Sequence, residues 1–492
     1  MSTSDQQQAV KEGFFERAFG NVSSAWRDIA ATAARSVGVT LPAGAAGNPD
    51  LLEKLMAECL EARGGEVAAR GRAAELGRIY LQLDEAGRVL FLEVLARRFA
   101  VDQTAVETAM ADYTAAADEE ARLAAQLALR RALVPPRVKL LTQFNGLPEG
   151  VKFLADLRAD LLPLAKQDAY LHGLDKDLHD LLTSWFDVGF LDLRRIDWNS
   201  PASLLEKLIA YEAVHEIRSW DDLRNRLDSD RRCFALFHPR MPDEPLAFIE
   251  VALTKGIAGS VQSLLDEQAP SSDPKEADAA IFYSISNTQP GLQGISFGDY
   301  LIKMVVRELS GDFPNLKIFS TLSPVPGLRK WLDARDAKSL EQSMSEDERG
   351  GLRALGGSDD TREALHSLLD SPDWWQDPVT AKALEGLLVR FAARYFTETR
   401  TDGAPIDPVA RFHLRNGARL ERINWLGDTS AKGLRQSAGL MVNYRYILDD
   451  IEKNHEAFVS KGTVAMSADV KALAKRAREG GGGAALRRLG LG

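Results

Sequence analysis

Apolar residues recur at helical spacing along the first third of the chain. Between residues 84 and 99, Val89, Leu92 and Leu95 lie three or six positions apart, and charged residues occupy positions between them. This spacing places one apolar stripe along a helix, as in an amphipathic helix that packs on a core. We therefore expect residues 1–183 to form an all-helical domain that serves for packing and for homo-oligomerisation.

The pattern changes near Trp185, where short apolar runs rich in β-formers begin. Helical stretches separate several of these runs, which is typical of strands in a mixed α/β domain. The predicted strands are residues 232–237, 246–253, 280–286 and 316–319. The sequence thus predicts an α+β fold, in which the all-helical domain is followed by a mixed α/β catalytic domain at residues 184–480. A helix-rich insertion is expected at 339–400, and residues 481–492 are expected to be a disordered tail.

Length and composition narrow the class of protein. At 492 residues the chain exceeds one ordinary core, so two domains are expected. A net charge of −10 argues against a nucleic-acid partner, because nucleic-acid binders usually carry a basic excess. No apolar run approaches the ~20 residues that span a bilayer, and residues 1–13 lack a signal-peptide pattern, so no membrane partner is expected. Cys59 and Cys233 lie far apart, which argues against disulfides and a cysteine-rich zinc site and fits a reducing cytoplasm.

A glycine-rich turn between a strand and a helix carries most of the candidate chemistry. The first N–H groups of a helix have no internal partners, and the helix dipole adds positive charge there. Glycines let the main chain approach a phosphate closely, and Ser296 could cap the helix. The turn consists of Gln293, Gly294, Ile295, Ser296, Phe297, Gly298 and Asp299. It predicts a cradle for an anionic diphosphate, although a purely structural glycine turn is the alternative.

The spacing of this turn differs from that of the dinucleotide and P-loop fingerprints. It resembles the acyl-CoA pyrophosphate loop of the N-acetyltransferase superfamily. In that superfamily the strands before and after the loop splay apart, and the acyl group lies in the gap between them. The resemblance therefore implies an N-acetyltransferase-like catalytic domain.

The chain also resembles the malonyl-CoA decarboxylase family over residues 186–448. Five separated blocks carry this resemblance in the same order: FYSISNTQPGLQG, STLSPVPG, DPVARFHLRNGA, RINWLGDTS and GLMVNYRYIL. The resemblance implies conversion of malonyl-CoA to acetyl-CoA and CO2 without metal, biotin or another cofactor. Animal members end in a peroxisomal Ser-Lys-Leu, whereas this chain ends in Leu-Gly, which favours a cytoplasmic location.

The resemblance assigns functional residues as well. It places the CoA loop at residues 293–299, the catalytic serine at Ser323 in LSPVPG, and the catalytic histidine at His413 in RFHLRNG. Animal members have a glutamate at the position of Ser296, so the role of that carboxylate does not transfer to this chain.

Decarboxylation of malonyl-CoA explains why these residue types are suitable. Loss of CO2 leaves a carbanion conjugated with the thioester, so the reaction needs donors for the thioester oxygen and an acid for the α-carbon. Histidine can hold or release a proton near neutrality. Ser323 is followed by Pro324 and precedes Pro326, so its hydroxyl is presented rigidly. Our hypothesis is that Ser323 binds the malonyl carboxylate and that His413 protonates the carbanion.

A basic stretch near the C-terminal end could bind the CoA phosphates or the malonyl carboxylate, or could be a salt-bridged surface. Its members are Arg411, Arg415, Arg419, Arg422, Lys432, Arg435 and Arg445. Asn424 and Tyr446 are plausible pocket residues. His172 and His179 are seven positions apart near several aspartates, but the spacing is not that of a zinc helix, so an exposed helix is the simpler interpretation and no metal is expected.

Two other functions compete with decarboxylation. An acyl-CoA-dependent N-acyltransferase would use the same cradle but needs an amine site and a base. A non-catalytic acyl-CoA sensor would bind without turnover, with the helical domain contacting partners.

Overall fold

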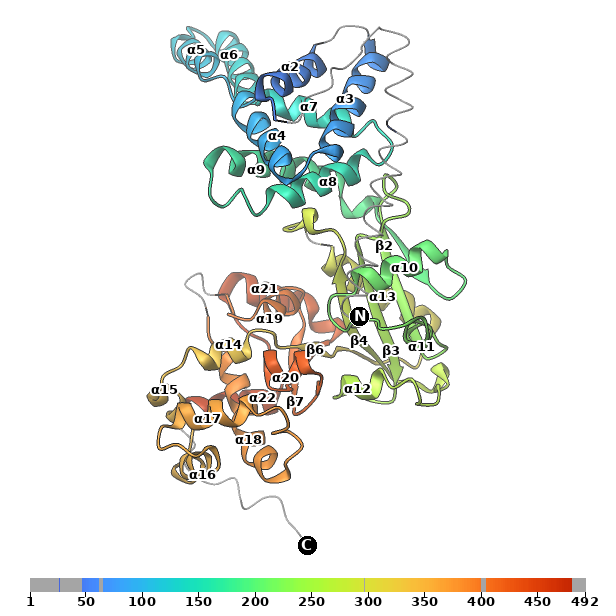
Figure 1. Ribbon diagram of the computed structural model, residues 1–492, viewed down its shortest axis with the longest axis vertical. Coiled ribbons are helices and arrows are strands. Elements are labelled where there is room, and N and C mark those ends of the chain that lie inside the picture. Colours follow the sequence, from blue (N-terminus) through green and yellow to red (C-terminus); the bar gives the residue numbers. More distant parts are fainter. Residues whose placement is uncertain (1–25, 27–46, 62–64, 296, 400–403, 480–492) are drawn as a thin grey trace.

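The structure is a computed structural model that describes residue 26 and residues 47–61, 65–295, 297–399 and 404–479. In this part of the chain, the N-terminal region is helical throughout (Figure 1). Its helices are α2 (Pro49–Leu60), α3 (Gly65–Gln82), α4 (Glu85–Arg98), α5 (Gln103–Ala115), α6 (Glu119–Ala132), α7 (Pro136–Phe144), α8 (Gly150–Leu161) and α9 (Ala169–Trp185). The predicted tail at 481–492 lies outside the described residues.

Local sequence explains where these helices begin and what they bury. Helix α4 closely matches the stretch predicted from its apolar spacing, and the Asp84 side chain accepts a hydrogen bond from the Gly87 N–H at its start. Leu92 and Leu95 are fully buried. An aromatic group that includes Trp26 and Phe153 packs at the centre of the helical region, with ring centroids 4.9 Å apart.

The second region is built on one mixed sheet with the order β1-β2-β3-β4-β5-β8-β6, in which β7 also pairs with β8. Neighbouring strands are antiparallel, except for the parallel pair β4–β5. The strands are β1 (Asp192–Ile196), β2 (Arg231–Phe237), β3 (Ala247–Thr254), β4 (Ala279–Asn287), β5 (Ile318–Thr321), β6 (Ser323–Pro324), β7 (Arg419–Asn424) and β8 (Met441–Tyr446). The α+β class, with a helical region before a mixed sheet, is confirmed.

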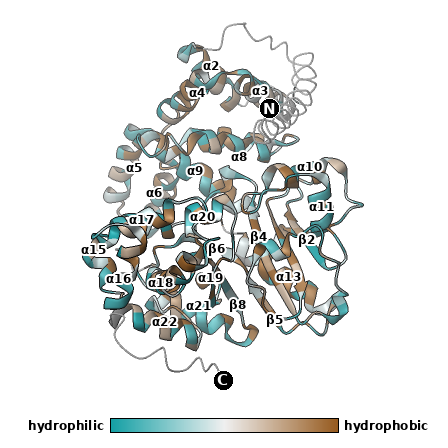
Figure 2. Ribbon diagram, turned by 60° about the horizontal axis from the view of Figure 1, so that its bottom comes forward, coloured by the Kyte–Doolittle hydropathy of each residue, from teal (hydrophilic) through white to brown (hydrophobic). Residues whose placement is uncertain are grey.

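Helices cover both faces of the sheet. Helix α13 (Gly298–Asp312), which joins β4 to β5, packs across β1, β2 and β3 and buries Leu301, Val305 and Leu309 fully. Figure 2 shows apolar positions gathered where α13 overlies the strands. The opposite face is covered by α10 (Ala202–Tyr211), α11 (Trp220–Arg226) and the short α12 (Val261–Leu264), with Leu205, Leu208 and Leu223 among the buried side chains. The 3-10 turns are η1 (Val188–Phe190), η2 (Pro274–Glu276), η3 (Pro290–Leu292) and η4 (Leu448–Asp450).

Strand β5 pairs along its whole length with only the first half of β4. Their parallel register runs from Ala279 opposite Ile318 to Phe282 opposite Thr321. Beyond that point β4 continues beside β3, whereas β6 pairs with β8. The two strands therefore part at Ser323, as expected for the strands on either side of the glycine-rich turn.

The rest of the chain is mostly helical and includes the predicted insertion. Its helices are α14 (Leu328–Asp333), α15 (Ala337–Glu341), α16 (Glu346–Gly356), α17 (Thr361–Asp370), α18 (Pro378–Tyr395), α19 (Pro408–Arg415), α20 (Ala431–Ser437), α21 (Ile451–Lys461) and α22 (Ala468–Glu479). In Figure 1 the helical N-terminal region lies at the top and helices α15–α18 lie at the lower left, with strands β2–β4 to the right. The division at residue 183 and the domain limits stay predictions.

Candidate active site

Ser323 and His413 lie next to each other although ninety positions separate them. Ser323 is on β6, His413 is on α19, and the Ser323 Oγ is 3.3 Å from the His413 Nε2. Their residues are 6% and 3% exposed. The fold therefore brings the two predicted catalytic side chains into one buried contact, just beyond the point where the β4–β5 pairing ends.

A chain of hydrogen bonds runs through this contact, and we call its members Tyr446, His413, Ser323 and Thr321 the site network. The Ser323 hydroxyl donates to Thr321 Oγ1 at 2.9 Å, so Ser323 Oγ accepts from the Nε2–H of His413. The His413 Nδ1 then accepts from the Tyr446 hydroxyl at 2.8 Å. The network thus assigns one tautomer, with the imidazole proton on Nε2 toward Ser323.

The imidazole of His413 is neutral in this environment. Burial alone lowers the pKa of His413 to about 3, because an imidazolium there would lose its hydration. The Tyr444 ring stacks on it, with centroids 4.6 Å apart and planes at 25°. At neutral pH the group is a positioned N–H donor rather than a cation.

Local structure explains how α19 places His413. Asp407 caps the helix by accepting the Ala410 N–H at 2.7 Å, and Pro408 occupies the first turn. The Tyr395 hydroxyl donates to the same carboxylate at 3.1 Å. Asp407 is fully buried, and burial raises the pKa of its carboxyl group. The start of the catalytic helix is therefore held by a buried network of its own.

Gly298 couples the glycine-rich turn to the same helix. A Cβ at this position would lie 2.4 Å from the ring of Phe412, the neighbour of His413. The first residue of α13 and the catalytic helix are thus in direct contact. Glycine at 298 is required by this packing, as well as suiting a close approach to a ligand.

The remaining residues of the predicted CoA loop precede α13. Gln293 and Gly294 are exposed, Ile295 is half-buried, and Phe297 is buried. Gly294 has a φ of 90°, the left-handed conformation that favours glycine. The predicted capping residue, Ser296, lies outside the described residues, and Asp299 is placed only as part of the α13 backbone.

Helix α13 begins at Gly298 with Phe297 at its cap position, two residues after the predicted Ser296 cap. Among the described residues no side chain caps this helix. The N–H groups of its first turn have no intrahelical acceptors. Such a helix start is suited to an anionic ligand, as the loop sequence predicts.

The basic stretch is largely engaged in structural contacts. Arg419 and Arg445 pair with Glu421. Arg422 donates to Asn443 Oδ1 and to the Ile257 carbonyl, and Lys432 donates to the carbonyls of residues 213 and 214. These four residues are therefore engaged in salt bridges and in hydrogen bonds to backbone carbonyls or to Asn443, as in the alternative of a salt-bridged surface.

Of the two plausible pocket residues, Tyr446 is a member of the site network and Asn424 is not. Asn424 donates to Asn443 Oδ1 at 2.8 Å, on the β7–β8 pair. Thr321 was not predicted, although it could have been found from strand periodicity. It lies two positions before Ser323, so its side chain points to the same face of the strand.

Cavities approach the site network from α21. A groove of about 620 Å³ is lined by Lys303, Asn416 and Ile451, together with residues of α21. A smaller cavity of about 90 Å³ shares these three residues and also reaches Tyr446. One member of the site network, Tyr446, thus lines a cavity.

Metal ligands do not cluster in the described part of the chain: no three His, Cys, Asp or Glu side chains there could hold an ion. His179 Nδ1 is 3.2 Å from Asp180 Oδ1, and His172 is exposed. Within the described ranges, every helix is too short or too polar to span a bilayer.

The fold and this site define an α+β protein in which a helical region precedes a mixed sheet that holds a buried serine–histidine pair. The chain belongs to the malonyl-CoA decarboxylase family. Residues 99–186 match the malonyl-CoA decarboxylase N-terminal domain, and residues 189–481 match the malonyl-CoA decarboxylase C-terminal domain. The resemblance seen in the sequence is confirmed.

Individual relatives are similar over most of their length. The protein named "Malonyl-CoA decarboxylase, mitochondrial" from Anser anser anser is 39% identical over 419 residues, which cover 82% of this chain and 83% of the relative. The crystal structure of malonyl-CoA decarboxylase from Agrobacterium vitis is 46% identical with a TM-score of 0.77 and covers 86% of this chain and 99% of its own. The structure from Rhodopseudomonas palustris has the same TM-score and coverage at 44% identity.

Proposed function

We propose that this protein decarboxylates malonyl-CoA to acetyl-CoA and CO2 without a metal ion or biotin. The observation that carries the proposal is the buried Ser323–His413 contact just beyond the point where the β4–β5 pairing ends. The names and identities of the relatives support the same substrate. The glycine-rich turn at the start of α13 would hold the CoA diphosphate.

In the proposed mechanism, the loop at residues 293–299 orients the thioester and directs its malonyl group toward Ser323. The serine hydroxyl turns to the malonyl carboxylate and holds it out of the thioester plane. The bond between that carboxylate and the α-carbon then breaks, CO2 leaves, and the electron pair delocalises into the thioester as an enolate. His413, protonated in the substrate complex, gives its Nε2 proton to the α-carbon, which forms the methyl group of acetyl-CoA. The neutral imidazole that remains then regains a proton from solvent.

The low pKa of His413 is compatible with this role. In the free protein the neutral imidazole donates a hydrogen bond through its Nε2–H, as in other enzymes that keep a catalytic histidine neutral, whereas proton transfer to the α-carbon requires the imidazolium. The bound malonyl carboxylate also brings a negative charge close to the ring, and such a charge favours the protonated form of histidine. Substrate binding would thus raise the pKa of the group that must supply the proton. Tyr446 would keep Nε2, rather than Nδ1, as the nitrogen that faces the substrate.

A product assay tests the proposal and its competitors. The full-length protein is incubated with labelled malonyl-CoA, with no acyl acceptor, in the presence of a chelator and avidin. We expect one acetyl-CoA and one CO2 for each malonyl-CoA consumed. Free CoA and malonate would contradict decarboxylation, transfer only after an amine is added would favour an N-acyltransferase, and tight binding without turnover would favour a sensor.

We also propose that the helical region mediates self-association. Helices α5 and α6 pack on each other, and none of the α6 residues is buried. Large apolar side chains are exposed on this pair: Met110, Tyr113, Leu123 and Leu127, each at 41–58%. Contiguous exposed apolar surface commonly marks a protein interface. Light scattering should give an oligomer for the wild type and a smaller species for Leu123→Glu/Leu127→Glu; equal masses would contradict the proposal.

For location we propose the cytoplasm. Cys59 and Cys233 are both free and buried, as is usual in a reducing compartment. Named relatives are mitochondrial, so fractionation of the native cell is the deciding measurement. Recovery in an organelle fraction would contradict a cytoplasmic location.

A further inference from the structure

The segment that leads into the proposed CoA loop packs against the helical N-terminal region rather than against the mixed sheet. Turn η3, which directly precedes this loop, packs against α8. At Gly291 a Cβ would lie 1.6 Å from the carbonyl oxygen of Ala155, so the two backbones touch. Only glycine allows that approach without displacement of one backbone. The position of the loop is therefore set by a helix of the N-terminal region.

Arg158 of α8 makes the polar part of this contact. Its residue is 3% exposed, and its Nη1 donates to the Gly291 carbonyl at 2.7 Å and to the Gln293 carbonyl at 2.9 Å. Its Nε donates to Asp175 Oδ1 on α9 at 2.7 Å. One buried guanidinium thus connects two helices of the N-terminal region to the carbonyl of Gly291 in η3 and to that of Gln293, the first residue of the loop.

The orientation of those carbonyls fixes the orientation of the next amide. In a trans peptide the C=O and the following N–H point in opposite directions, and the described residues have no cis bond. Because the Gln293 carbonyl points at Arg158, the Gly294 N–H points away from it. No acceptor for that N–H lies among the described residues. The arginine thereby presents a backbone donor on the side of the loop opposite the helical region.

We infer that Arg158 is a positioning residue of the acyl-CoA site, which holds the loop so that the Gly294 N–H meets the CoA diphosphate. The inference rests on the proposed function, because it presumes that the loop binds CoA. The N-terminal region then shapes the substrate site directly, in addition to any part in assembly.

The chain offers a matched control in Arg137. This arginine is 6% exposed, its Nε donates to Asp177 Oδ2 on α9 at 2.6 Å, and its Nη1 donates to the Ala96 carbonyl at 2.6 Å. Arg137 and Arg158 are thus both buried, and each donates to an aspartate carboxylate on α9 and to backbone carbonyl oxygen. The difference is that Arg137 binds a carbonyl of the helical region, whereas Arg158 binds carbonyls of the loop.

Arg158→Lys and Arg137→Lys are compared in the full-length protein, with Arg158→Gln made in parallel in case one variant folds poorly. Substrates are malonyl-CoA and malonyl-pantetheine, which lacks the diphosphate. For the Arg158 variants we expect KM for malonyl-CoA to rise about tenfold, as for loss of a hydrogen bond to a charged group, with kcat within twofold. Their kcat/KM for malonyl-pantetheine should equal that of the wild type. Arg137→Lys should lower Tm similarly and leave both KM values unchanged.

Three outcomes overturn the inference. An equal rise in KM for both substrates would show a general distortion of the site. A rise in Arg137→Lys as large as in Arg158→Lys would show a stability effect. If the wild type itself treats malonyl-CoA and malonyl-pantetheine alike, the diphosphate cradle of the proposed function fails first, and the role of Arg158 fails with it.

Discussion

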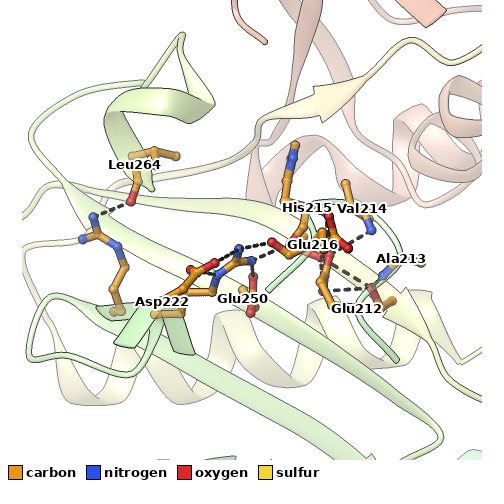
Figure 3. Close-up of polar contacts among 12 residues, drawn as sticks. Glu212, Ala213, Val214, His215, Glu216, Asp222, Glu250 and Leu264 are labelled. Atoms are coloured by element: carbon orange, nitrogen blue, oxygen red, sulfur yellow. Dashed lines mark hydrogen bonds and ion pairs between the residues drawn. The ribbon is translucent and has the colours of Figure 1, made fainter. Parts of the chain in front are cut away.

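The sheet carries two buried polar networks, one on its α13 side and one on its α10–α11 side. They differ in whether their side chains carry formal charge. The site network of Tyr446, His413, Ser323 and Thr321 carries no formal charge when His413 is neutral. The second, which we call the charged network, consists of Glu212, Asp222, Arg226, Glu250, Ser284 and Ser286. Figure 3 labels its three acidic members, Glu212, Asp222 and Glu250.

In the charged network every carboxylate has a donor. Arg226 donates to Asp222 and Glu250 and to the carbonyls of residues 215 and 216. Glu212 accepts from two serine hydroxyls and from the N–H groups of residues 214 and 215. Even so, burial raises the pKa of Glu250 to about 8. The network is internally saturated, so we assign it a structural role.

The hydrogen bonds of the site network are all made when His413 is neutral, but the network contains no counter-charge for a protonated His413. Burial has removed the hydration of His413 without supplying a counter-charge, which is why its pKa falls so far. An anionic substrate would provide that missing charge. The two networks thus differ in their charged partners: Glu250 has Arg226, which offsets part of its burial, whereas His413 has none until an anionic substrate binds.

The largest expected effect is on kcat, and it should appear only when the site network is changed. His413→Asn should lower kcat by roughly 10²- to 10⁴-fold, the usual contribution of general acid–base catalysis, because the proton donor is lost. His215→Asn is the control, since His215 enters the charged network through its backbone. Steady-state rates with malonyl-CoA and circular dichroism measure activity and folding. Near-normal turnover of folded His413→Asn would contradict the proposed mechanism.

The next largest effect is on stability, and it distinguishes the charged network from the site network. Arg226→Met leaves Asp222 and Glu250 buried without their cation, which should cost about 3–5 kcal/mol of unfolding free energy. The kcat of the molecules that remain folded should stay close to that of the wild type. Urea unfolding gives the free energy. Adding Glu250→Gln to Arg226→Met should recover part of the loss, and no recovery would mean that the cost is not electrostatic.

A pH dependence follows from the pKa of His413. The folded pKa is about 3 and an unfolded histidine titrates near 6.5, so between these values only the unfolded state gains a proton. Stability therefore falls as the pH decreases. Between pH 7.5 and pH 5, this residue should account for a loss of about 2 kcal/mol. Urea unfolding at both values should show a smaller loss in His413→Asn, and identical losses would contradict a buried neutral imidazole.

Local sequence predicted the elements whose apolar pattern is uninterrupted. Helix α4 and strands β2, β3 and β4 came within about one residue of the predicted ends. Strands β1 and β7 were missed, because DLRRI and RLERIN carry charges on partly exposed positions. β8 was missed as well.

Long-range contacts explain the features of the fold and of the site that the local sequence did not predict. Asn443 interrupts the apolar run of β8, yet it is fully buried because its amide donates to the carbonyls of Ala258 and Thr321. Arg158 sits in an amphipathic helix and is buried by carbonyls more than 130 positions away. The proximity of Ser323 and His413 was likewise implied by the family resemblance and not by local spacing. Such partners are set by tertiary structure, which no local pattern contains.

The smallest effect tests whether the tautomer of His413 matters, and it compares one buried hydroxyl from each network. Tyr446→Phe keeps the ring but removes the donor to Nδ1, so the proton is no longer confined to Nε2. We expect kcat to fall about tenfold, equivalent to the roughly 1.4 kcal/mol of one buried hydrogen bond, with KM little changed. Ser284→Ala removes a hydroxyl that donates to Glu212 and should leave kcat unchanged. Equal losses of kcat in both variants, or a rise in KM alone for Tyr446→Phe, would mean that Tyr446 supports packing or binding and does not hold the proton on Nε2.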